Sequence, residues 1–427
     1  MVLLSTESER FLASLRSKIA NIMKEASAVS VFKDSVLQPV RLQKARCACF
    51  IPLSWQSANG CRMRVRVRLN ACLTAWPNEQ GEGETGNSPG AVTEDEITRA
   101  ALTIAFAMLN PDYVAWDVER YADMTKNGVE SKQHEKLRKY FSTSPRGKIS
   151  EPTTIVDNHG KILVWYLPNI LSPERVNFIN VATKGLRGLL LRSIPVLSEN
   201  KKQTWRSGNF LERDGEFGAG RLTISPAYFM LGHERLQDPL VTSASYSAKE
   251  VQDWLGVMSS TEFFWNAVTG AIAPDLFDAG LTAISEVQGK TRAFTNSVPV
   301  SQWPSIFSAL EVIANRVTLP HRDAGGAPSH YDMLVSLGIG HDAIFSIKDL
   351  EADLDYFPGT MCFICGKVLE HSVGPWKKGE RFVLAHFIKD KVHDRVCVDR
   401  PPFPVQGDFL HLVGSKDDRP KKRLRTK

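Results

Sequence analysis

The sequence has no long hydrophobic run and few cysteines. No apolar segment approaches the roughly 18 residues that a membrane-spanning helix needs. The first residues, MVLLSTESER, soon turn polar, so we expect neither a membrane association nor a secretory signal. Seven cysteines are an odd number, which favours reduced intracellular thiols over a disulfide framework. Hydrophobic residues make up 43% and charged residues 23%, which excludes a fully disordered or fibrous protein.

The net charge of +6 is concentrated at the C-terminal end of the sequence. The last twelve residues, KDDRPKKRLRTK, contain seven Lys or Arg and two Asp and therefore account for +5 of that charge. The remainder is nearly neutral, so a uniformly positive surface is not implied. The basic cluster from Pro420 to Lys427 is typical of a nuclear localisation signal or a phosphate-binding arm. A solvated, disordered end is the alternative. We expect a basic tail over residues 413–427 and a location in the nucleus.

A helix and a strand are predicted in the first part of the chain. Apolar residues at helical spacing predict an amphipathic helix over residues 7–27. Further on, four arginines alternate with apolar residues and so lie on one face of a strand; they are Arg62, Arg64, Arg66 and Arg68. Their spacing of about 7 Å is close to that of nucleic-acid phosphates. The strip therefore indicates either contact with a DNA backbone or an edge strand protected by charge.

A glycine-rich stretch over residues 81–92 predicts a mobile loop. Thr93 and Glu96 have the spacing of a capping box, which begins a helix that reaches Leu109. Pro111 is typical of the first turn of another helix, which would run toward Lys126. We therefore expect residues 1–150 to form an α+β accessory region that contacts DNA.

The second part, residues 151–412, mixes strands and helices and then becomes rich in strands. KILVWYLPNIL predicts a strand, whereas SAKEVQDWLGVM and FFWNAVTGAI predict helices. After about residue 312, short apolar runs are separated by Gly, Pro and Asp turns. This pattern is typical of a sandwich or barrel. The fold class expected for the whole chain is α+β.

Four residues in this strand-rich part have the chemistry of an iron-dependent oxygenase. His321 and Asp323 form a His-x-Asp triplet, His371 lies 48 residues beyond Asp323, and Arg381 follows ten residues later. Two imidazoles and one carboxylate on one face of Fe(II) leave three coordination positions open. In an oxygenase that uses 2-oxoglutarate, a guanidinium can bind the far carboxylate of the cosubstrate by two parallel hydrogen bonds. The four residues together are far more specific than the triplet alone.

The segments LPHRDAGG and EHSVGPWKKGERFVLAHF resemble the Fe(II)/2-oxoglutarate dioxygenases of the TET/JBP family, particularly the compact homologues of mushroom-forming fungi. The resemblance spans roughly residues 205–395 and includes RLTISPAYFMLG. It implies a double-stranded β-helix (jelly-roll, cupin-like) core flanked by helices. It also implies His321, Asp323 and His371 as iron ligands and Arg381 as the 2-oxoglutarate ligand. Fe(II), 2-oxoglutarate and O₂ are then the expected cofactors, with ascorbate as a stimulant, and the partner is duplex DNA whose methylated base is flipped out.

The sequence departs from the family pattern at two places. Many members have serine two residues after the cosubstrate arginine, where this chain has Val383. Some cytosine-acting members place a base-reading Asp three residues after the metal Asp, where this chain has Gly326. Gly325 and Gly326 would permit the close approach of a flipped base. Asp332 is a candidate acceptor for the exocyclic amine of adenine or cytosine, and a turn residue is its alternative role. Tyr331 is one candidate for stacking on the flipped base; Tyr228 and Phe229 are others.

The remaining cysteines and histidines have less specific patterns. Four N-terminal cysteines lack the usual C-x₂-C pairs of zinc sites and favour burial as free thiols; they are Cys47, Cys49, Cys61 and Cys72. Cys362 and Cys365 are expected in the core. His386 is at an odd offset from Arg381 and should face the other side of its strand. Three further histidines are weaker candidates for the site; they are His330, His341 and His393.

The sequence therefore favours a monomeric Fe(II)/2-oxoglutarate dioxygenase that acts on a methylated base in duplex DNA. Both 5-methylcytosine and N6-methyladenine remain open as substrates. Oxidation of the first gives hydroxymethylcytosine and higher products, whereas oxidation of the second ends in adenine and formaldehyde. The alternatives are the same chemistry on RNA or on a protein side chain, and a catalytically inactive DNA-binding barrel.

Overall fold

The computed structural model describes residues 2–34, 90–124, 146–194, 208–211, 215–230, 235, 238–290 and 303–409. The arginine strip, the four N-terminal cysteines, nearly all of the glycine-rich loop and the basic tail lie outside these residues. What the sequence predicts for those segments stays a prediction. In the part of the chain that the structure describes, none of the helices is both long and apolar enough to cross a membrane.

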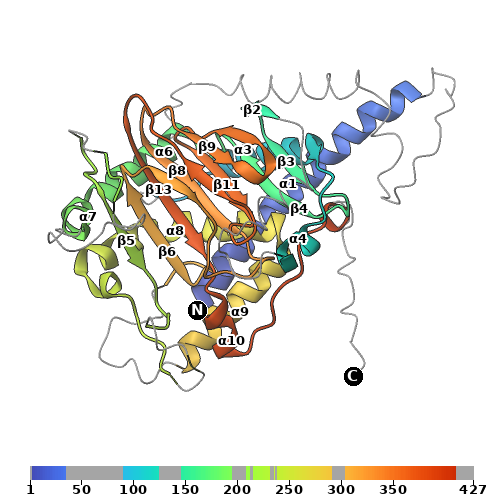
Figure 1. Ribbon diagram of the computed structural model, residues 1–427. Helices are drawn as coiled ribbons and strands as arrows, with labels where there is room; N and C mark the ends of the chain where they lie inside the picture. Colours follow the sequence, from blue (N-terminus) through green and yellow to red (C-terminus); the bar gives the residue numbers. More distant parts are fainter. Residues whose placement is uncertain are drawn as a thin grey trace.

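The strands form two facing sheets (Figure 1). The larger sheet has the order β1-β3-β4-β11-β8-β13-β6-β5 and the smaller has the order β2-β10-β9-β12-β7. The strands of the larger sheet are β1 (Pro111–Tyr113), β3 (Thr153–Val156), β4 (Ile162–Leu167), β5 (Gly220–Ile224), β6 (Ala309–Ala314), β8 (Asp332–Ile339), β11 (Thr360–Ile364) and β13 (Glu380–Phe387). Those of the smaller are β2 (Gly147–Ile149), β7 (Thr318–His321), β9 (Ile344–Ile347), β10 (Ala352–Asp355) and β12 (His371–Val373).

The eight strands from β6 to β13 define the fold. The larger sheet contributes β6, β8, β11 and β13, and the smaller contributes β7, β9, β10 and β12, so the chain passes repeatedly from one sheet to the other. All neighbours within this set are antiparallel. This arrangement is a double-stranded β-helix, as the resemblance implied. The interior between the two sheets holds the residues described in the next subsection.

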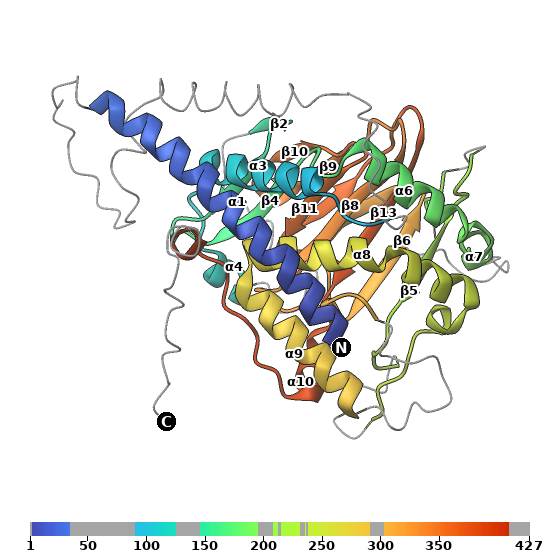
Figure 2. The same ribbon diagram turned by 180° about the vertical axis from the view of Figure 1, so that it is seen from behind.

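Several helices cover the outer face of the larger sheet (Figure 2). The helices are α1 (Val2–Asp34), α3 (Glu94–Leu109), α4 (Val118–Met124), α6 (Pro173–Lys184), α7 (Arg187–Ser193), α8 (Lys249–Ile272), α9 (Pro274–Lys290) and α10 (Asp390–Val396), with short 3₁₀ turns η2 (Ala244–Ser247) and η5 (Lys348–Leu350). The amphipathic pattern of α1 is confirmed, because Phe11, Leu15 and Ile19 are buried. The capping box of α3 is also present, with Thr93 and Glu96 bonded in both directions.

The described part of residues 1–150 packs against the strand-rich part of the chain. Helix α1 lies against α8 and α3, and β1 extends the larger sheet by pairing with β3. One continuous hydrophobic cluster includes residues of α1, α3, α8 and the strands. The N-terminal helices therefore help to build the support behind the sheet.

One local prediction was wrong. Pro111 begins strand β1, and the following helix starts only at Val118. The edge strand needs no amide hydrogen at its first position, so proline is tolerated there. The helical predictions for SAKEVQDWLGVM and FFWNAVTGAI are confirmed, and both segments lie in one continuous helix, α8.

Candidate metal centre

Three candidate metal ligands meet at the ends of two neighbouring strands of the smaller sheet. His321 ends β7, His371 begins β12, and these two residues are direct partners in the antiparallel pairing. Their rings are 4.3 Å apart between centroids. Asp323 lies with its carboxylate oxygens 3.7 Å from Nε2 of His321 and 3.4 Å from Nε2 of His371. The strand pairing therefore brings together residues 50 positions apart in the sequence.

The donor set fits a divalent iron ion. One atom from each of the three residues lies within 4.8 Å of the others. In both histidines, Nδ1 is near a backbone carbonyl, 2.9 Å from Leu319 and 3.0 Å from Leu369, so Nε2 is the nitrogen that each ring offers to a metal. Burial and the neighbouring His371 lower the pKa of His321 to about 4. The imidazole is thus neutral at pH 7, as a metal ligand must be.

A second carboxyl group lies against the ligand Asp323. Asp332, at the start of β8, is buried, and its burial together with the charge of Asp323 raises its pKa well above the usual range. Its protonated form can donate a hydrogen bond to Asp323. A Cβ atom at Gly366 would collide with Asp332 and lie 2.7 Å from Oδ2 of Asp323. Asp332 therefore sits beside the metal ligand, where the sequence predicted a contact with the base.

A buried ion-pair network holds the two ligand segments together. Arg322, between His321 and Asp323, donates from Nη2 to both oxygens of Asp349 at 2.9 and 2.8 Å. Its Nη1 lies 3.4 Å from Glu370, the residue before His371. The backbone N–H of Glu370 donates to Asp349 at 2.6 Å. Sequence reasoning missed this network, although Arg322 and Glu370 are direct neighbours of the predicted ligands.

Arg381 lies near the start of β13 and points into the interior between the sheets. It is 2% exposed, and its Nε and Nη1 atoms have no hydrogen-bond acceptor among the described residues. Its Cζ lies 5.1 Å from the ring centroid of Tyr356 and 5.8 Å from that of Trp376. Burial lowers the pKa of Arg381 from its ordinary value. A buried guanidinium with unpaired donors suits a carboxylate ligand, so the residues present fit 2-oxoglutarate as well as iron.

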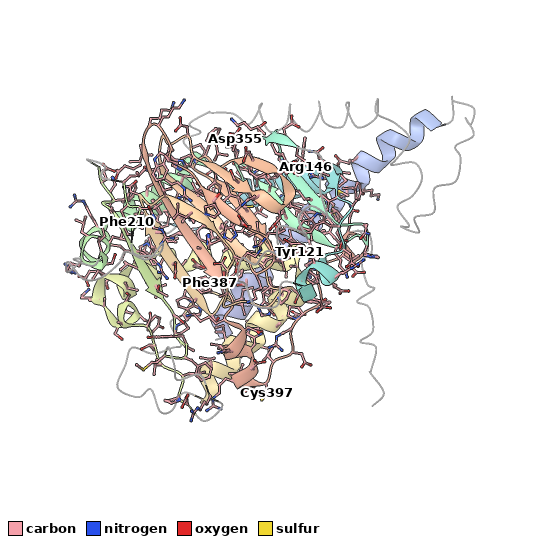
Figure 3. All side chains as sticks on the ribbon, viewed as in Figure 1. Tyr121, Arg146, Phe210, Asp355, Phe387 and Cys397 are labelled. Atoms are coloured by element: carbon pink, nitrogen blue, oxygen red, sulfur yellow. The ribbon has the colours of Figure 1, made fainter. Side chains whose placement is uncertain are left out.

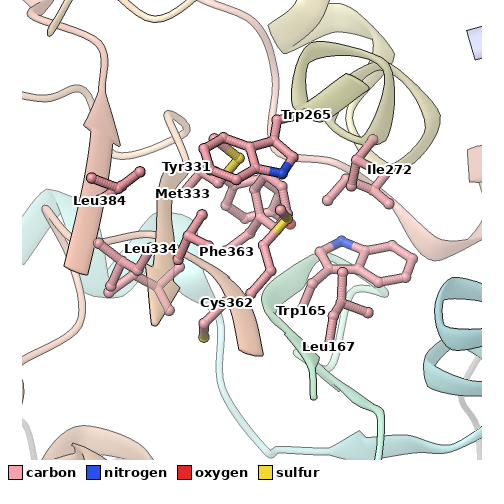
Figure 4. Close-up of a cluster of buried hydrophobic side chains, with 14 of the residues drawn as sticks. Trp165, Leu167, Trp265, Ile272, Tyr331, Met333, Leu334, Cys362, Phe363 and Leu384 are labelled. Atoms are coloured by element: carbon pink, nitrogen blue, oxygen red, sulfur yellow. The ribbon is translucent and has the colours of Figure 1, made fainter. Parts of the chain in front are cut away.

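The residues predicted to contact the substrate fall in different places. Gly326 and Gly325 leave open space, because a Cβ at Gly325 would meet no atom within 4 Å and one at Gly326 only a carbonyl at 3.8 Å. Tyr331 lies in the hydrophobic core beside Trp265 and Phe363 (Figure 4). Its hydroxyl donates to the carbonyl of Ile162 at 2.6 Å. It is fully buried and does not present a ring for stacking, so that prediction was wrong.

The other aromatic candidates lie nearer the surface. Tyr228 is partly buried, and its ring is 5.0 Å from Nζ of Lys389. Phe229 packs against a small hydrophobic cluster that includes Val392. Tyr228 therefore stays a candidate for the flipped base.

The weaker candidates are mostly structural. His386 faces the helices as predicted, with Nε2 2.9 Å from Glu262 of α8. His330 and His393 are buried beside each other at 5.2 Å between ring centroids, and neither belongs to the group of three candidate metal ligands. Cys362 and Cys365 are buried, as expected. Cys397, at the end of α10, is exposed (Figure 3).

His341 lies close to the arginine. It is buried, and burial together with the positive charge of Arg381 lowers its pKa to about 3. Its Nε2 is 3.1 Å from the carbonyl of Leu337. A neutral His341 therefore borders the cosubstrate position.

Comparison with known proteins gives a matching family model and distantly similar solved structures. Residues 227–390 match Tet_JBP, the oxygenase domain of the 2OGFeDO superfamily. The structure is also similar to that of NgTET1 in complex with 5mC DNA, with a TM-score of 0.37 and 13% identity over 63% of this chain and 91% of that one. No curated protein matches the chain.

Proposed function

We propose that this enzyme oxidises the methyl group of a methylated base flipped out of duplex DNA, because residues 227–390 match the Tet_JBP oxygenase domain of the 2OGFeDO superfamily. The observation that carries the proposal is the pairing of His321 with His371 beside Asp323, together with Arg381 held inside the same barrel. This geometry supports iron and 2-oxoglutarate chemistry, and the family supports a nucleic-acid base as the substrate.

The protein's own residues have separate tasks in this reaction. Iron, 2-oxoglutarate and O₂, when bound, supply the oxidation of a C–H bond. His321, Asp323 and His371 would hold the iron, and Arg381 would fix the far carboxylate of 2-oxoglutarate by charge-assisted hydrogen bonds. The buried ring of Phe345 packs against His371 and would limit the access of water to the metal position. The open space at Gly325 and Gly326 admits a base next to the ligands.

Two substrates follow from the same pocket. The family favours 5-methylcytosine, whereas the absence of an Asp at position 326 and the presence of Asp332 favour N6-methyladenine. Either base must leave the stack at a cost of a few kcal/mol. Asp332 would accept a hydrogen bond from the exocyclic amine that both bases carry. The base would then lie close to Asp323 as well, because Asp332 is in contact with the carboxylate of Asp323.

The proposal also covers contact with DNA and the location of the enzyme in the cell. Residues Arg62 to Arg68 would contact the DNA backbone, and the basic tail would direct the protein to the nucleus. We further propose a monomer whose turnover is stimulated by ascorbate. The same chemistry on RNA or on a protein side chain is the second candidate, because the fold and ligands would be the same.

Nucleoside mass spectrometry tests the proposed substrate. Two duplexes, one with 5-methylcytosine and one with N6-methyladenine, are incubated aerobically with Fe(II), 2-oxoglutarate, ascorbate and the full chain. Hydroxymethyl-, formyl- or carboxylcytosine supports the first substrate, and adenine with formaldehyde supports the second. Consumption of 2-oxoglutarate with neither base changed would contradict DNA as the substrate. Bound iron with no consumption would favour an inactive DNA-binding barrel.

Ligand variants test the assignment of the metal. His321→Ala and Asp323→Ala are each expected to abolish iron binding and turnover, because two remaining ligands cannot hold Fe(II) on one face. Iron content and product formation are measured on the same preparations. A variant that stays active without iron would disprove the ligand assignment.

A further inference from the structure

The position for the far carboxylate of 2-oxoglutarate has an unused hydrogen-bond donor besides Arg381. Val383 shares the face of Arg381 on β13, because side chains two residues apart in a strand point the same way. Valine offers no hydroxyl at the place where many TET/JBP proteins have serine. A second hydrogen-bond donor to the far carboxylate of 2-oxoglutarate would therefore have to come from another part of the chain.

Tyr356 lies opposite Arg381, directly after strand β10 of the smaller sheet. Its backbone is fixed on both sides: its N–H donates to Ala343 at 3.0 Å, and its carbonyl accepts from Oγ of Ser336 at 2.7 Å. Its ring centroid is 5.1 Å from Cζ of Arg381. The two side chains thus face each other across the interior of the barrel.

The hydroxyl of Tyr356 has no hydrogen-bond acceptor among the described residues, although the residue is 1% exposed. Buried polar groups almost always have a partner, so a buried donor that lacks an acceptor indicates that a ligand supplies it. Burial raises the pKa of Tyr356 well above its ordinary value, and the charge of the nearby Arg381 and a hydrogen bond from its guanidinium to the phenol oxygen oppose this effect. The guanidinium has no acceptor atom, so the O–H of Tyr356 still lacks one. The phenol therefore keeps its proton and can act as a donor.

A continuous row of aromatic rings joins this phenol to the metal ligands. The ring of Phe345 is 5.2 Å from that of Tyr356 and 5.7 Å from that of His371. A cosubstrate that lies along Phe345 would have one end beside His371 and the other between Tyr356 and Arg381. Two nitrogens of Arg381 and one hydroxyl, all without an acceptor among the described residues, meet at that second end.

We propose that the Tyr356 hydroxyl donates a hydrogen bond to the far carboxylate of 2-oxoglutarate, beside Arg381 and in place of the missing serine. This makes Tyr356 a cosubstrate-binding residue. The inference rests on the oxygenase assignment and is independent of the choice between DNA and another substrate.

Anaerobic titration tests this role without turnover. The iron-loaded protein is titrated with 2-oxoglutarate, and binding is followed by the visible charge-transfer absorbance that forms when a 2-oxo acid chelates Fe(II). Tyr356→Phe removes the hydroxyl alone and keeps the ring contacts with Phe345 and Arg381. A hydrogen bond to a charged group predicts a loss of affinity of roughly tenfold or more.

A second ligand separates direct contact from a general disturbance. 2-Oxopentanoate has the keto acid that chelates iron but lacks the far carboxylate. Its affinity is expected to be equal for wild type and Tyr356→Phe. Tyr246→Phe is the matched control, because Tyr246 is equally buried but packs against Trp303, and it should leave both affinities unchanged.

The outcomes are distinct. An unchanged affinity of Tyr356→Phe for 2-oxoglutarate would overturn the role of Tyr356, and so would equal losses for both ligands. A wild-type protein that binds iron but neither 2-oxo acid would overturn the cosubstrate site as a whole. A failed assay on methylated DNA with intact titrations would leave the role of Tyr356 supported and contradict only the proposed substrate.

Discussion

Among single residues, Gly366 leaves the space that the carboxylate of the candidate ligand Asp323 occupies. Its carbonyl accepts from the backbone N–H of Asp323 at 2.9 Å, and a Cβ at this position would press on the carboxyl groups of Asp323 and Asp332. Gly366→Ala is therefore expected to displace the ligand carboxylate and weaken metal affinity by roughly 10- to 100-fold, as for other residues that orient ligands. Titration with Co(II), followed by its visible spectrum, measures the change.

Gly374→Ala is the matched control. Gly374 comes directly after β12, the strand that begins with His371, and a Cβ at this position would meet no atom within 4 Å. Its metal affinity should equal that of wild type. If Gly366→Ala binds Co(II) as tightly as this control, the crowding around Asp323 has no consequence for the metal.

Arg381 gives the second prediction at this scale. Arg381→Ala is expected to raise the 2-oxoglutarate concentration needed for half-maximal turnover by at least about tenfold, since it removes a charge-assisted pair. Iron binding should remain, because Arg381 is not among the ligands. An unchanged requirement for 2-oxoglutarate would show that another cation binds the far carboxylate.

The candidate metal ligands could be predicted from the sequence, whereas the residues that surround and position them could not. His321, Asp323 and His371 could be predicted because two imidazoles and a carboxylate at that spacing match the requirements of one kind of metal site. Asp332 and Gly366 could not be placed, because contacts between β8 and the turn after β11 depend on strand pairing that no local pattern specifies. Tyr331 was misjudged for the same reason: its aromatic ring fits either a base stack or a core, and only packing against Phe363 decides.

At the scale of elements, Arg175 ties three helices together. From α6 it donates to Glu96 of α3 at 2.7 and 2.9 Å, to Thr261 of α8 at 3.0 Å, and to the carbonyls of Gly90 and Ala91. Arg175→Ala would leave Glu96 buried without its partner, which costs about 3–5 kcal/mol. Urea unfolding followed by circular dichroism measures the loss of unfolding free energy.

Lys249→Ala serves as the comparison, because Lys249 pairs with Asp253 in an exposed i, i+4 arrangement on α8. Such a pair contributes little in water, so the unfolding free energy should stay close to that of wild type. Equal losses in the two variants would show that the buried network does not hold the helices.

The elements themselves were predicted where their periodicity was strong. The helices at α1 and α3 were found from apolar spacing and a capping box, since both signals are local. Strand β10 was not predicted, because ADLD carries two charges and pairs in register with β9 and β2. Pro111 was assigned to a helix because proline suits a first turn as well as an edge strand.

For the molecule as a whole, three buried histidines outside the metal site link folding to pH. Burial is the largest cause that lowers the pKa of His330 and His341 to about 3 and that of His393 to about 4. In the unfolded chain the same groups titrate near 6.5. The unfolded state therefore binds more protons than the folded state between about pH 6.5 and pH 4.

The sign of the pH dependence follows from this difference. The contribution of these histidines to the unfolding free energy is fully present above about pH 7. It falls as the pH drops through 6.5, by up to about 1.4 kcal/mol for each histidine and pH unit. Unfolding free energies from urea titrations at pH 7.5, 6.5 and 5.5, with saturating metal in every sample, should decrease in that order.

His393→Gln removes one of these groups, so its unfolding free energy should fall by about 1 kcal/mol less than that of wild type between pH 7.5 and 5.5. His159→Gln is the control, because the side chain of His159 is 55% exposed and lies outside this group of buried histidines. It should keep the wild-type slope. If His393→Gln also keeps that slope, His393 takes up its proton in the folded protein, and the packing of α10 against His330 tolerates the charge.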